Sequence, residues 1–417
     1  MRNSSPAKLE TYINTQFEGA MWRHIEIRNF RSIEHASVTL APFTAVVGPN
    51  ASGKSNFTDA FVFARDIAHD ASSAVQNRGG IVSVRRWRPS KPVDVSIDVK
   101  VAFTKELLNH TYARHSFTLA GRRDGEWEFK RETVEEFKDG NCLIQATRVR
   151  EKITGWVNTA QGAIYPTPPI NEINKTLSIM LLARQMAPLR HLRYMPALRN
   201  VGRFRLDSQS MREPQLATER VRLDESGSNI AMAIKHIRKN PDAWNEVLKA
   251  MKRIVPGLKN IQDGALGRYL SIRFFQHQGG KEVAEFAATE MSEGAIRALG
   301  ILVAAQQMTR DELLLVEEPE VSIHPGAATV LFDVLSRASK RGAVLLTTHS
   351  PELLDAAQKD EILVCEYRDG VTHVGRMDES QRSLVRDGLV SAGELMRSEP
   401  LRIEGLPPAV IAAETAV

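Results

Sequence analysis

The sequence has 417 residues, 42% of them hydrophobic, so the chain can bury a large core divided over two or three structural units. Its formal net charge of +5 permits anionic partners, and its two cysteines, Cys142 and Cys365, exclude a disulfide framework or a cysteine-rich metal site and fit a reducing compartment. Because no apolar run reaches the roughly 18 residues of a transmembrane helix and residues 1–20 lack a signal-peptide core, we expect a cytoplasmic protein with no membrane partner.

Changes in hydrophobic periodicity predict five segments along the chain. Residues 1–21 are expected to form a polar tail, and residues 22–157 alternate apolar and polar residues, which is typical of strands. Residues 158–265 predict a helical insertion, because the stretches 170–186, 228–240 and 241–255 each show the i, i+3, i+4 spacing of a helix. Strands and helices then alternate over residues 266–385, which predicts parallel βαβ units in a second lobe, and residues 386–417 form a C-terminal tail. We therefore expect an α/β fold with a parallel sheet core, an antiparallel β layer and a helical insertion.

The stretch FTAVVGPNASGKSNF, residues 43–57, places a glycine-rich loop between a short strand and a helix. From Gly48 to Ser55 it fits G-x-x-x-x-G-K-[ST] at every position. Gly48 and Gly53 allow backbone torsions that turn successive N–H groups inward to cradle phosphate oxygens, and the helix expected over 56–69 adds the positive end of its dipole. We expect Lys54 to bind the β- and γ-phosphates of a nucleoside triphosphate and the Ser55 hydroxyl to bind Mg²⁺. A chance glycine-rich turn is the alternative.

A second motif lies at the start of an amphipathic helix in MSEGAIRALGILVAAQQM, where Ser292 suits the N-cap position and is followed by Glu293 and Gly294. Capping alone explains the serine. A helix N-terminus can also present N–H donors and its dipole to a γ-phosphate that is bound on another subunit.

The stretch LLLVEE, residues 313–318, has the pattern of a buried parallel strand that ends in two carboxylates. Such strand ends face the ligand in open α/β folds, so Glu317 would anchor Mg²⁺ directly or through water and Glu318 would polarise the attacking water as a general base. The alternative is that the acidic pair only caps the turn before Pro319. After the next strand, LLTTHSPELL places His349 close to the expected phosphates, although a lone histidine is often structural.

The order of these motifs is glycine-rich loop, long insertion, Ser-Glu-Gly helix, acidic strand end and strand-end histidine. In this order the chain resembles the ABC-type ATPases of the RecF, SMC and OLD group, in particular the compact stand-alone members filed under the AAA label. The resemblance covers roughly residues 22–355, with a looser match in the insertion, and it implies an ABC/RecF-type P-loop ATPase head. It rests on the blocks IEIRNFRSIEHASVTL, GPNASGKSNF, MSEGAIRAL, LLLVEEPEVSIHP and LLTTHSPELLD.

This resemblance implies that ATP and Mg²⁺ bind at these motifs. Glu317 and Glu318 match Walker B, although relatives commonly have Asp at the first position. His349 matches the switch histidine that contacts the γ-phosphate. Arg31 stands where relatives often place a nucleotide-facing arginine, but it could equally pair with a surface acid. The remaining cofactor-binding residues are those of Walker A and its surroundings, Gly48, Asn50, Gly53, Lys54, Ser55 and Asn56, and those of the signature motif that completes the site of the opposing subunit, Ser292, Glu293 and Gly294.

The same resemblance implies an ATP-dependent homodimer that traps ATP at a head-to-tail interface and acts in DNA maintenance or anti-phage defence. No nuclease-type acidic cluster follows His349, so we expect the chain to have no nuclease activity of its own. The resemblance implies that it acts as sensor and regulator of a separately encoded nuclease. One alternative is a DNA-repair ATPase that binds DNA directly through the arginine-rich segments 85–91 and 184–205. Another is a transporter subunit, which the long insertion disfavours because transporter ATPases place the signature much closer to the P-loop.

Overall fold

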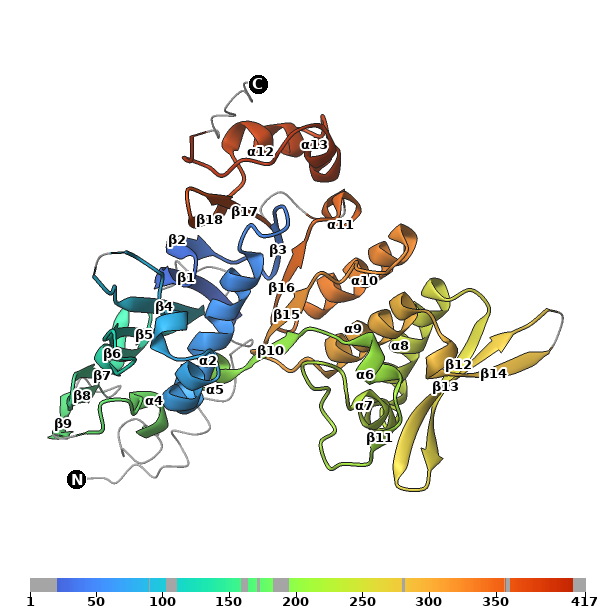
Figure 1. Ribbon diagram of the computed structural model, residues 1–417, viewed down its shortest axis with the longest axis horizontal. Coiled ribbons are helices and arrows are strands. Elements are labelled where there is room, and N and C mark those ends of the chain that lie inside the picture. The colour runs from blue at the N-terminus through green and yellow to red at the C-terminus, as the bar shows by residue number, and fades with distance from the viewer. Residues whose placement is uncertain are drawn as a thin grey trace.

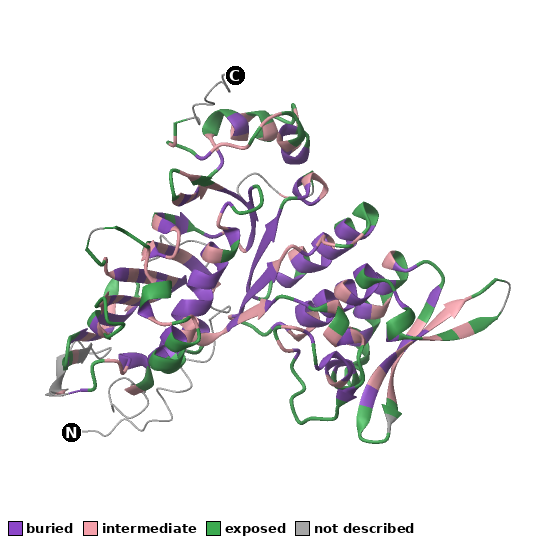
Figure 2. Ribbon diagram, viewed as in Figure 1, coloured by how far each residue is buried: buried purple, intermediate pink, exposed green. Residues whose placement is uncertain are grey.

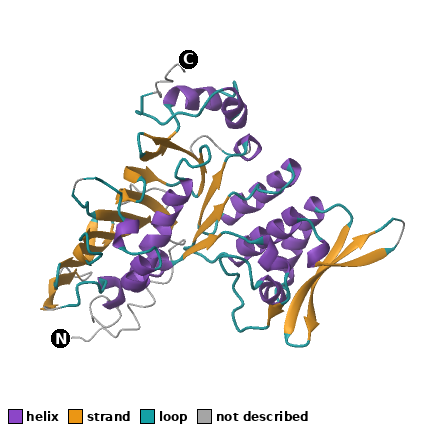
Figure 3. Cartoon of the chain, viewed as in Figure 1, coloured by secondary structure: helices purple, strands orange, loops and turns teal. Residues whose placement is uncertain are grey.

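The computed structural model describes residues 21–89, 91–102, 111–158, 164–170, 173–182, 195–279, 282–355, 357 and 361–407. A sheet of 14 strands runs through the molecule, and a smaller sheet of four strands lies apart from it (Figure 1, Figure 3). Five neighbouring strands form the parallel core of the large sheet, in the spatial order β10 (Val201–Phe204), β15 (Leu313–Glu317), β16 (Ala343–Thr348), β3 (Phe43–Val47) and β17 (Ile362–Arg368).

Helices cover both faces of this parallel core. Helix α2 (Lys54–Gln76) packs on one face, and α9 (Glu293–Gln307) and α10 (Pro325–Ala338) pack on the other (Figure 1). Neighbouring residues of β3 alternate between the two sides, so that Val46 joins the core under α2 whereas Val47 joins the core under α9 and α10. Burial on both faces explains the apolar runs of β3, β15 and β16, and Figure 2 shows the centre of the sheet as largely buried.

Beyond β17 the sheet continues into mostly antiparallel strands. Strand β17 pairs with β18 (Val371–Arg376), and β18 meets β2 through the parallel pair of Thr372 and Ile33. The parallel core and the antiparallel part are therefore one hydrogen-bonded sheet. Its remaining strands follow in the spatial order β2 (Ile33–Thr39), β1 (Met21–Phe30), β4 (Val95–Ala102), β5 (Tyr112–Gly121), β6 (Trp127–Lys138), β7 (Asn141–Val149), β8 (Lys152–Asn158) and β9 (Ile164–Ile170).

The other elements form three groups around the large sheet. Three short helices lie against α2, namely α3 (Ile81–Val84), α4 (Ile179–Leu182) and α5 (Met195–Arg199). A second lobe beside α9 and α10 contains α6 (Ser208–Arg212), β11 (Gln215–Leu216), α7 (Ile230–Ile237), α8 (Pro241–Ile254), β12 (Leu258–Leu266), β13 (Tyr269–His277), β14 (Val283–Ala287) and the 3₁₀ helix η3 (Ala288–Glu290). The C-terminal part adds α11 (Pro351–Asp355), α12 (Glu379–Arg386) and α13 (Ala392–Ser398) (Figure 1).

The structure confirms the α/β class, the alternating strands and helices of the second half, and the helices expected at α7 and α8. The range 158–265 is not purely helical, because it also contains β9 to β12, and β10 enters the main sheet beside β15. With only four residues, two of them polar or glycine, β10 is too short to show a strand periodicity. Within 170–186, expected as one helix, the described residues form only α4, and 183–194 lie outside the described residues, as do 1–20 and 408–417. Among the described helices, none combines the length and the apolar character that crossing a membrane requires.

Candidate active site

Three neighbouring strand ends carry the residues singled out in the sequence. In the parallel register Val47 of β3 lies opposite Thr348 of β16, and Thr347 lies opposite Glu317 of β15. The loops that leave these strands therefore start at the same edge of the sheet. This edge gathers the glycine-rich loop, the acidic pair and the strand-end histidine.

The glycine-rich loop contains two positions that require glycine. Gly53 has a φ of 100°, in the left-handed region, and a Cβ there would lie 2.1 Å from Thr372 Oγ1. A Cβ at Gly48 would lie 2.1 Å from the carbonyl oxygen of Cys365 on β17. The close approach of β17 and β18 to the loop therefore excludes a side chain at either position.

A series of polar contacts holds this loop. Thr372 donates from Oγ1 to the carbonyl oxygen of Ser52 at 3.1 Å and lies 2.7 Å from Ser32 Oγ. Asn56 donates from Nδ2 to Ser32 Oγ at 2.6 Å. The buried Cys365 thiol reaches the same Ser52 oxygen at 3.4 Å, and its burial raises the pKa of the thiol to about 11. Asn56, expected among the cofactor-binding residues, thus uses its amide group to support the loop.

Lys54 lies in the first turn of α2 and is only 5% exposed. Its Nζ donates to the carbonyl oxygens of Gly48 at 2.8 Å and Pro49 at 3.0 Å, so the ammonium group lies inside the curve of the loop. Asn50 is exposed on the same loop. The lysine and the N-terminus of a 23-residue helix together make this concavity favourable for anions.

Glu317 connects the end of β15 to the glycine-rich loop. Ser55 donates from Oγ to Glu317 Oε2 at 3.4 Å, and Thr58 donates to Oε1 at 3.2 Å. Arg205, which follows β10, places Nε 3.0 Å from the same Oε2. The carboxylate is 9% exposed. Hydroxyl and carboxylate oxygens are the ligands that Mg²⁺ prefers, so Ser55 and Glu317 fit this ion by the chemistry of their donors.

Glu318 is the first residue after β15 and has a φ of 46°, which is unusual for a residue other than glycine. Its backbone N–H donates to the carbonyl oxygen of Thr347 at 3.0 Å. Its carbonyl oxygen accepts a long hydrogen bond of 3.5 Å from Arg297 of α9. Contacts on both sides thus hold Glu318 in a backbone conformation that costs on the order of 1 kcal/mol or more.

His349 follows β16 and is 44% exposed. Its backbone N–H donates to Glu320 Oε1 at 3.0 Å, and its ring Nδ1 lies 3.6 Å from the same oxygen. The histidine therefore stands at the edge of the sheet beside a carboxylate that belongs to the turn after Glu318.

The start of α9 is exposed at Ser292 and Glu293. Ser292 is the N-cap and accepts a hydrogen bond from the Ala295 N–H at 3.3 Å. Gly294 is buried, and a Cβ there would lie 2.1 Å from the carbonyl oxygen of Ser322. The glycine thus lets α9 pack on the turn after β15, while the two residues before it remain at the surface.

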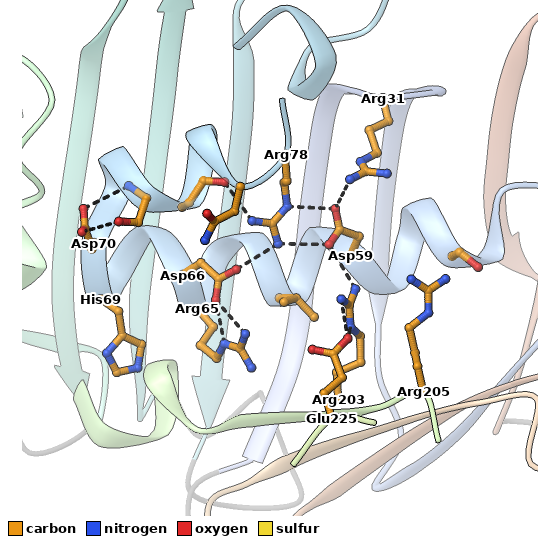
Figure 4. Close-up of a pocket in the computed structure, with 15 residues that line it drawn as sticks. Arg31, Asp59, Arg65, Asp66, His69, Asp70, Arg78, Arg203, Arg205 and Glu225 are labelled. Atoms are coloured by element: carbon orange, nitrogen blue, oxygen red, sulfur yellow. Dashed lines mark hydrogen bonds and ion pairs between the residues drawn. The ribbon is translucent and has the colours of Figure 1, made fainter. Parts of the chain in front are cut away.

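A polar recess of about 490 Å³ runs along α2 beside Ser55 (Figure 4). Three arginines converge there on Asp59, which is 4% exposed. The nearest N···O distances to its carboxylate are 2.8 Å for Arg31, 3.0 Å for Arg78 and 3.2 Å for Arg203. Arg31 thus pairs with an acid that is buried on α2, and not with an acid at the surface.

Three residues of this region, Asp59, Arg205 and Glu320, are not predicted from the sequence. Asp59 lies one helical turn after Ser55 on a helix face that also carries Asp66, so the sequence gives no sign that this one acid is buried. Glu320 follows the acidic pair in EEPE, but nothing local indicates its contact with the loop after β16. Arg205 was assigned only to an arginine-rich segment, because its partner is 112 positions away in Glu317 and no local pattern indicates it.

Comparison with known proteins agrees with this geometry. The family described as "AAA ATPase domain" matches residues 21–153, and the family described as "AAA domain, putative AbiEii toxin, Type IV TA system" matches residues 164–355. None of the curated proteins compared with the chain matches it.

Among solved structures, the Smc head bound to the C-winged helix domain of ScpA has 16% identity and a TM-score of 0.50, and the match covers 85% of this chain and 96% of that chain. The Smc head with an extended coiled coil, bound to the C-terminal domain of ScpA from Pyrococcus furiosus, has 14% identity, coverage of 89% and 99%, and a TM-score of 0.49. The SMC head domain from Thermotoga maritima has 12% identity, coverage of 86% and 99%, and a TM-score of 0.43. At 16% identity, the match to the Smc head bound to the C-winged helix domain of ScpA shows a similar fold and carries no conclusion about function. The two family matches, together with the P-loop architecture, identify the chain as an AAA-type ATPase, and its fold is similar to that of the first of these Smc heads.

Proposed function

We propose that the protein binds and hydrolyses ATP at an interface between two copies of the chain. The observation that carries this proposal is the meeting of the loop after β3 with the end of β15, where Ser55 contacts Glu317. A phosphate-binding loop, a lysine, a hydroxyl and paired carboxylates are the groups that Mg²⁺-dependent phosphoryl transfer to water requires. Phosphate release from ATP by the unaltered chain, absent in the Lys54→Ala variant, is the test. Equal release by both proteins would overturn the proposal.

Within one copy, each group has a distinct task. Lys54 and the N-terminus of α2 would bind the β- and γ-phosphates, while Ser55 and Glu317 would hold Mg²⁺. The bound ion would neutralise negative charge on the phosphate oxygens. Glu318, fixed by its contact with Thr347, would orient a water molecule and accept its proton, and positioning of this kind supplies most of the catalysis. His349 would contact the γ-phosphate from the next strand end.

The second copy would complete the site with its exposed Ser292 and Glu293. Their helix end carries about half a positive elementary charge, which suits a terminal phosphate. Unit charges 4 Å apart interact by about 4 kcal/mol at an effective dielectric constant near 20, so a triphosphate between two such surfaces would hold them together. Hydrolysis and loss of phosphate would then loosen the dimer.

The cellular role that we propose is control of a separately encoded nuclease in anti-phage defence or DNA maintenance. The match over residues 164–355 to a family described with a type IV TA system favours a control role over transport. Co-purification of the chain with the product of a neighbouring nuclease gene, in the presence of ATP, tests this role. A nuclease whose activity is the same with and without the ATP-bound chain would contradict it.

Direct DNA binding is the second candidate, and one observation favours it. Trp87, in the segment 85–91, is 78% exposed and stands between two arginines. Exposed aromatic rings beside arginines can stack on the bases of single strands. However, Arg86 and Arg88 both pair with Glu34, which lowers the positive charge available to a phosphate backbone.

The second arginine-rich segment, 184–205, is described only from 195 onward, and there two of its arginines pair with acids beside the site. Arg203 pairs with Asp59 and Glu225, and Arg205 pairs with Glu317. Single-stranded DNA binding, measured over a range of salt concentrations with and without ATP, tests this candidate. Direct binding predicts that Trp87→Ala weakens it and that the control Tyr367→Ala, at a 53% exposed tyrosine on β17, does not. Equal binding by the two variants would contradict a contact through Trp87.

A further inference from the structure

The loop that carries His349 is held by one buried carboxylate. Glu320 is 9% exposed, and its Oε1 accepts hydrogen bonds from the Thr348 hydroxyl at 2.6 Å and from the His349 N–H at 3.0 Å. Thr348 Oγ1 in turn accepts from the Ser350 N–H at 2.9 Å. A single carboxylate oxygen therefore fixes, directly or through Thr348, the backbone on both sides of the histidine.

The imidazole of His349 faces the same carboxylate. Its Nδ1 lies 3.6 Å from Glu320 Oε1, and a shift of about 0.5 Å would bring the pair within hydrogen-bond distance. Glu320 Oε2 is buried and has no hydrogen-bond partner among the residues that the structure describes. A buried carboxylate that retains an unused acceptor beside an imidazole is an arrangement that orients the ring, because an ionised carboxylate can only accept.

We propose that Glu320 is a positioning residue for His349 in the ATPase site. It accepts a hydrogen bond from Nδ1–H and so favours, in the neutral ring without nucleotide, the Nδ1-protonated tautomer with Nε2 directed toward the phosphate site. When ATP binds, Nε2 takes up a proton from solvent and donates a hydrogen bond to the terminal phosphate. This inference rests on the proposed function, because it takes His349 as the residue that contacts the γ-phosphate. It adds a residue that acts through the histidine and touches neither nucleotide nor Mg²⁺.

The turn that carries Glu320 links it to two other parts of the site. Glu318 lies two residues earlier, and the Val321 N–H donates to its carbonyl oxygen at 3.2 Å. Ser322, two residues later with a φ of 63°, is the residue against which Gly294 of α9 packs. The same short turn therefore carries the predicted general base, supports the histidine loop and contacts the helix whose start would face the partner copy.

Glu320→Gln separates the proposed role from a purely structural one. The glutamine carbonyl can still accept from Thr348 and from the His349 backbone, but the negative charge that orients the imidazole is lost. We expect kcat for ATP hydrolysis to fall about tenfold, in the range for a lost charge-assisted hydrogen bond, with ATP affinity changed less than about twofold. The midpoint of thermal unfolding, measured alongside, should stay within a few degrees of that of the unaltered chain.

A double-mutant cycle on kcat shows whether Glu320 acts through the histidine. If it does, Glu320→Gln should change kcat less than about twofold in a chain that already carries His349→Ala. An equal loss in both backgrounds would overturn the proposal. If Glu320→Gln does not fold, Thr348→Val can take its place in a double-mutant cycle with His349→Ala, because it removes the hydroxyl that links Glu320 to the Ser350 N–H.

A second readout does not depend on hydrolysis. Among the 11 histidines of a chain labelled with ¹⁵N at histidine, the imidazole signals of His349 can be assigned by their loss in His349→Gln. At pH 8 we expect the proton on Nδ1 in the unaltered chain and a shift toward the Nε2-protonated form in Glu320→Gln. An Nε2-protonated ring in the unaltered chain would overturn the assignment of Glu320. Absence of ATP hydrolysis by the unaltered chain would instead overturn the proposed function and leave this tautomer measurement to decide the role of Glu320.

Discussion

Ser55 and Glu317 are 262 positions apart in the chain, yet Ser55 Oγ donates to Glu317 Oε2 across 3.4 Å. The contact exists because β3 and β15 both pair in parallel with β16, so that the loop after one strand meets the carboxylate at the end of the other. Around this pair lie a buried lysine, a general-base candidate in an uncommon backbone conformation and a histidine held by a buried carboxylate.

Lys54→Ala should abolish ATP binding. The ammonium group lies inside the loop and would bring about 4 kcal/mol of attraction to each phosphate charge at 4 Å, so we expect affinity to fall roughly 1,000-fold. Titration of a fluorescent ATP analogue measures this loss. Lys249→Ala removes an exposed lysine of α8 and is the matched control, for which affinity should not change. Comparable affinities in the two variants would contradict the role of Lys54.

Ser292→Asp should block ATP-dependent dimerisation without destabilising the fold. Aspartate caps a helix about as well as serine, so α9 should keep its N-cap. A carboxylate facing a phosphate of the partner copy would be repelled, and we expect the dimer to weaken at least tenfold. Light scattering with ATP measures the change. The control Asn240→Asp places the same charge at the N-cap of α8 and should leave dimerisation intact. Equal ATP-dependent dimerisation of the two variants would place Ser292 outside the interface.

Asp59→Ala should destabilise the protein strongly. Removing this carboxylate leaves the nearly buried Arg78 with Asp66, and Arg203 with Glu225, as their remaining acidic partners, and removes the acid that they share with Arg31. We expect a loss of about 3 to 5 kcal/mol in the free energy of unfolding, as for other broken buried ion pairs. Urea unfolding measures it. Asp242→Ala, at an exposed first-turn position of α8, should cost less than about 1 kcal/mol. A similarly small loss of unfolding free energy in Asp59→Ala would contradict a stabilising role for the contacts between Asp59 and the three arginines.

Because the thiol of Cys365 is buried, we expect the folded protein to lose stability in strong alkali. Burial raises its pKa from an ordinary 9.0 to about 11, so the folded chain holds the proton more tightly than the unfolded chain. The stabilisation is fully present below pH 9 and is lost as the pH rises toward 11. We expect the free energy of unfolding to fall in this window by roughly 2 to 3 kcal/mol more than in Cys365→Ala. Parallel pH dependences of the two proteins would contradict a thiol that is protonated in the fold.

Local patterns in the sequence are sufficient to predict the elements whose own residues form a motif or a clear hydrophobic periodicity. The glycine-rich loop, the acidic end of β15 and the amphipathic helices α7 and α8 are visible from spacing alone, and the structure has strands and helices in these places. The strand β10 was not visible, because four residues with an arginine and a glycine show no periodicity, and its place is fixed only by pairing with β15. Likewise, the contacts of Arg205 with Glu317 and of Glu320 with Thr348 join residues that are distant in the chain, so only the folded sheet brings them together.

We propose that ATP joins two copies of the chain and that Glu318 then activates water for its hydrolysis. The most direct test is the size of the Glu318→Gln variant in solution with ATP and Mg²⁺, compared with Glu219→Gln at an exposed position. Glutamine keeps the shape of the side chain but cannot accept a proton, so hydrolysis should fall about 100-fold or more. We predict that Glu318→Gln binds ATP and accumulates as a stable dimer, whereas the control hydrolyses ATP and returns to the monomer. A Glu318→Gln variant that binds ATP and remains a monomer would contradict the account.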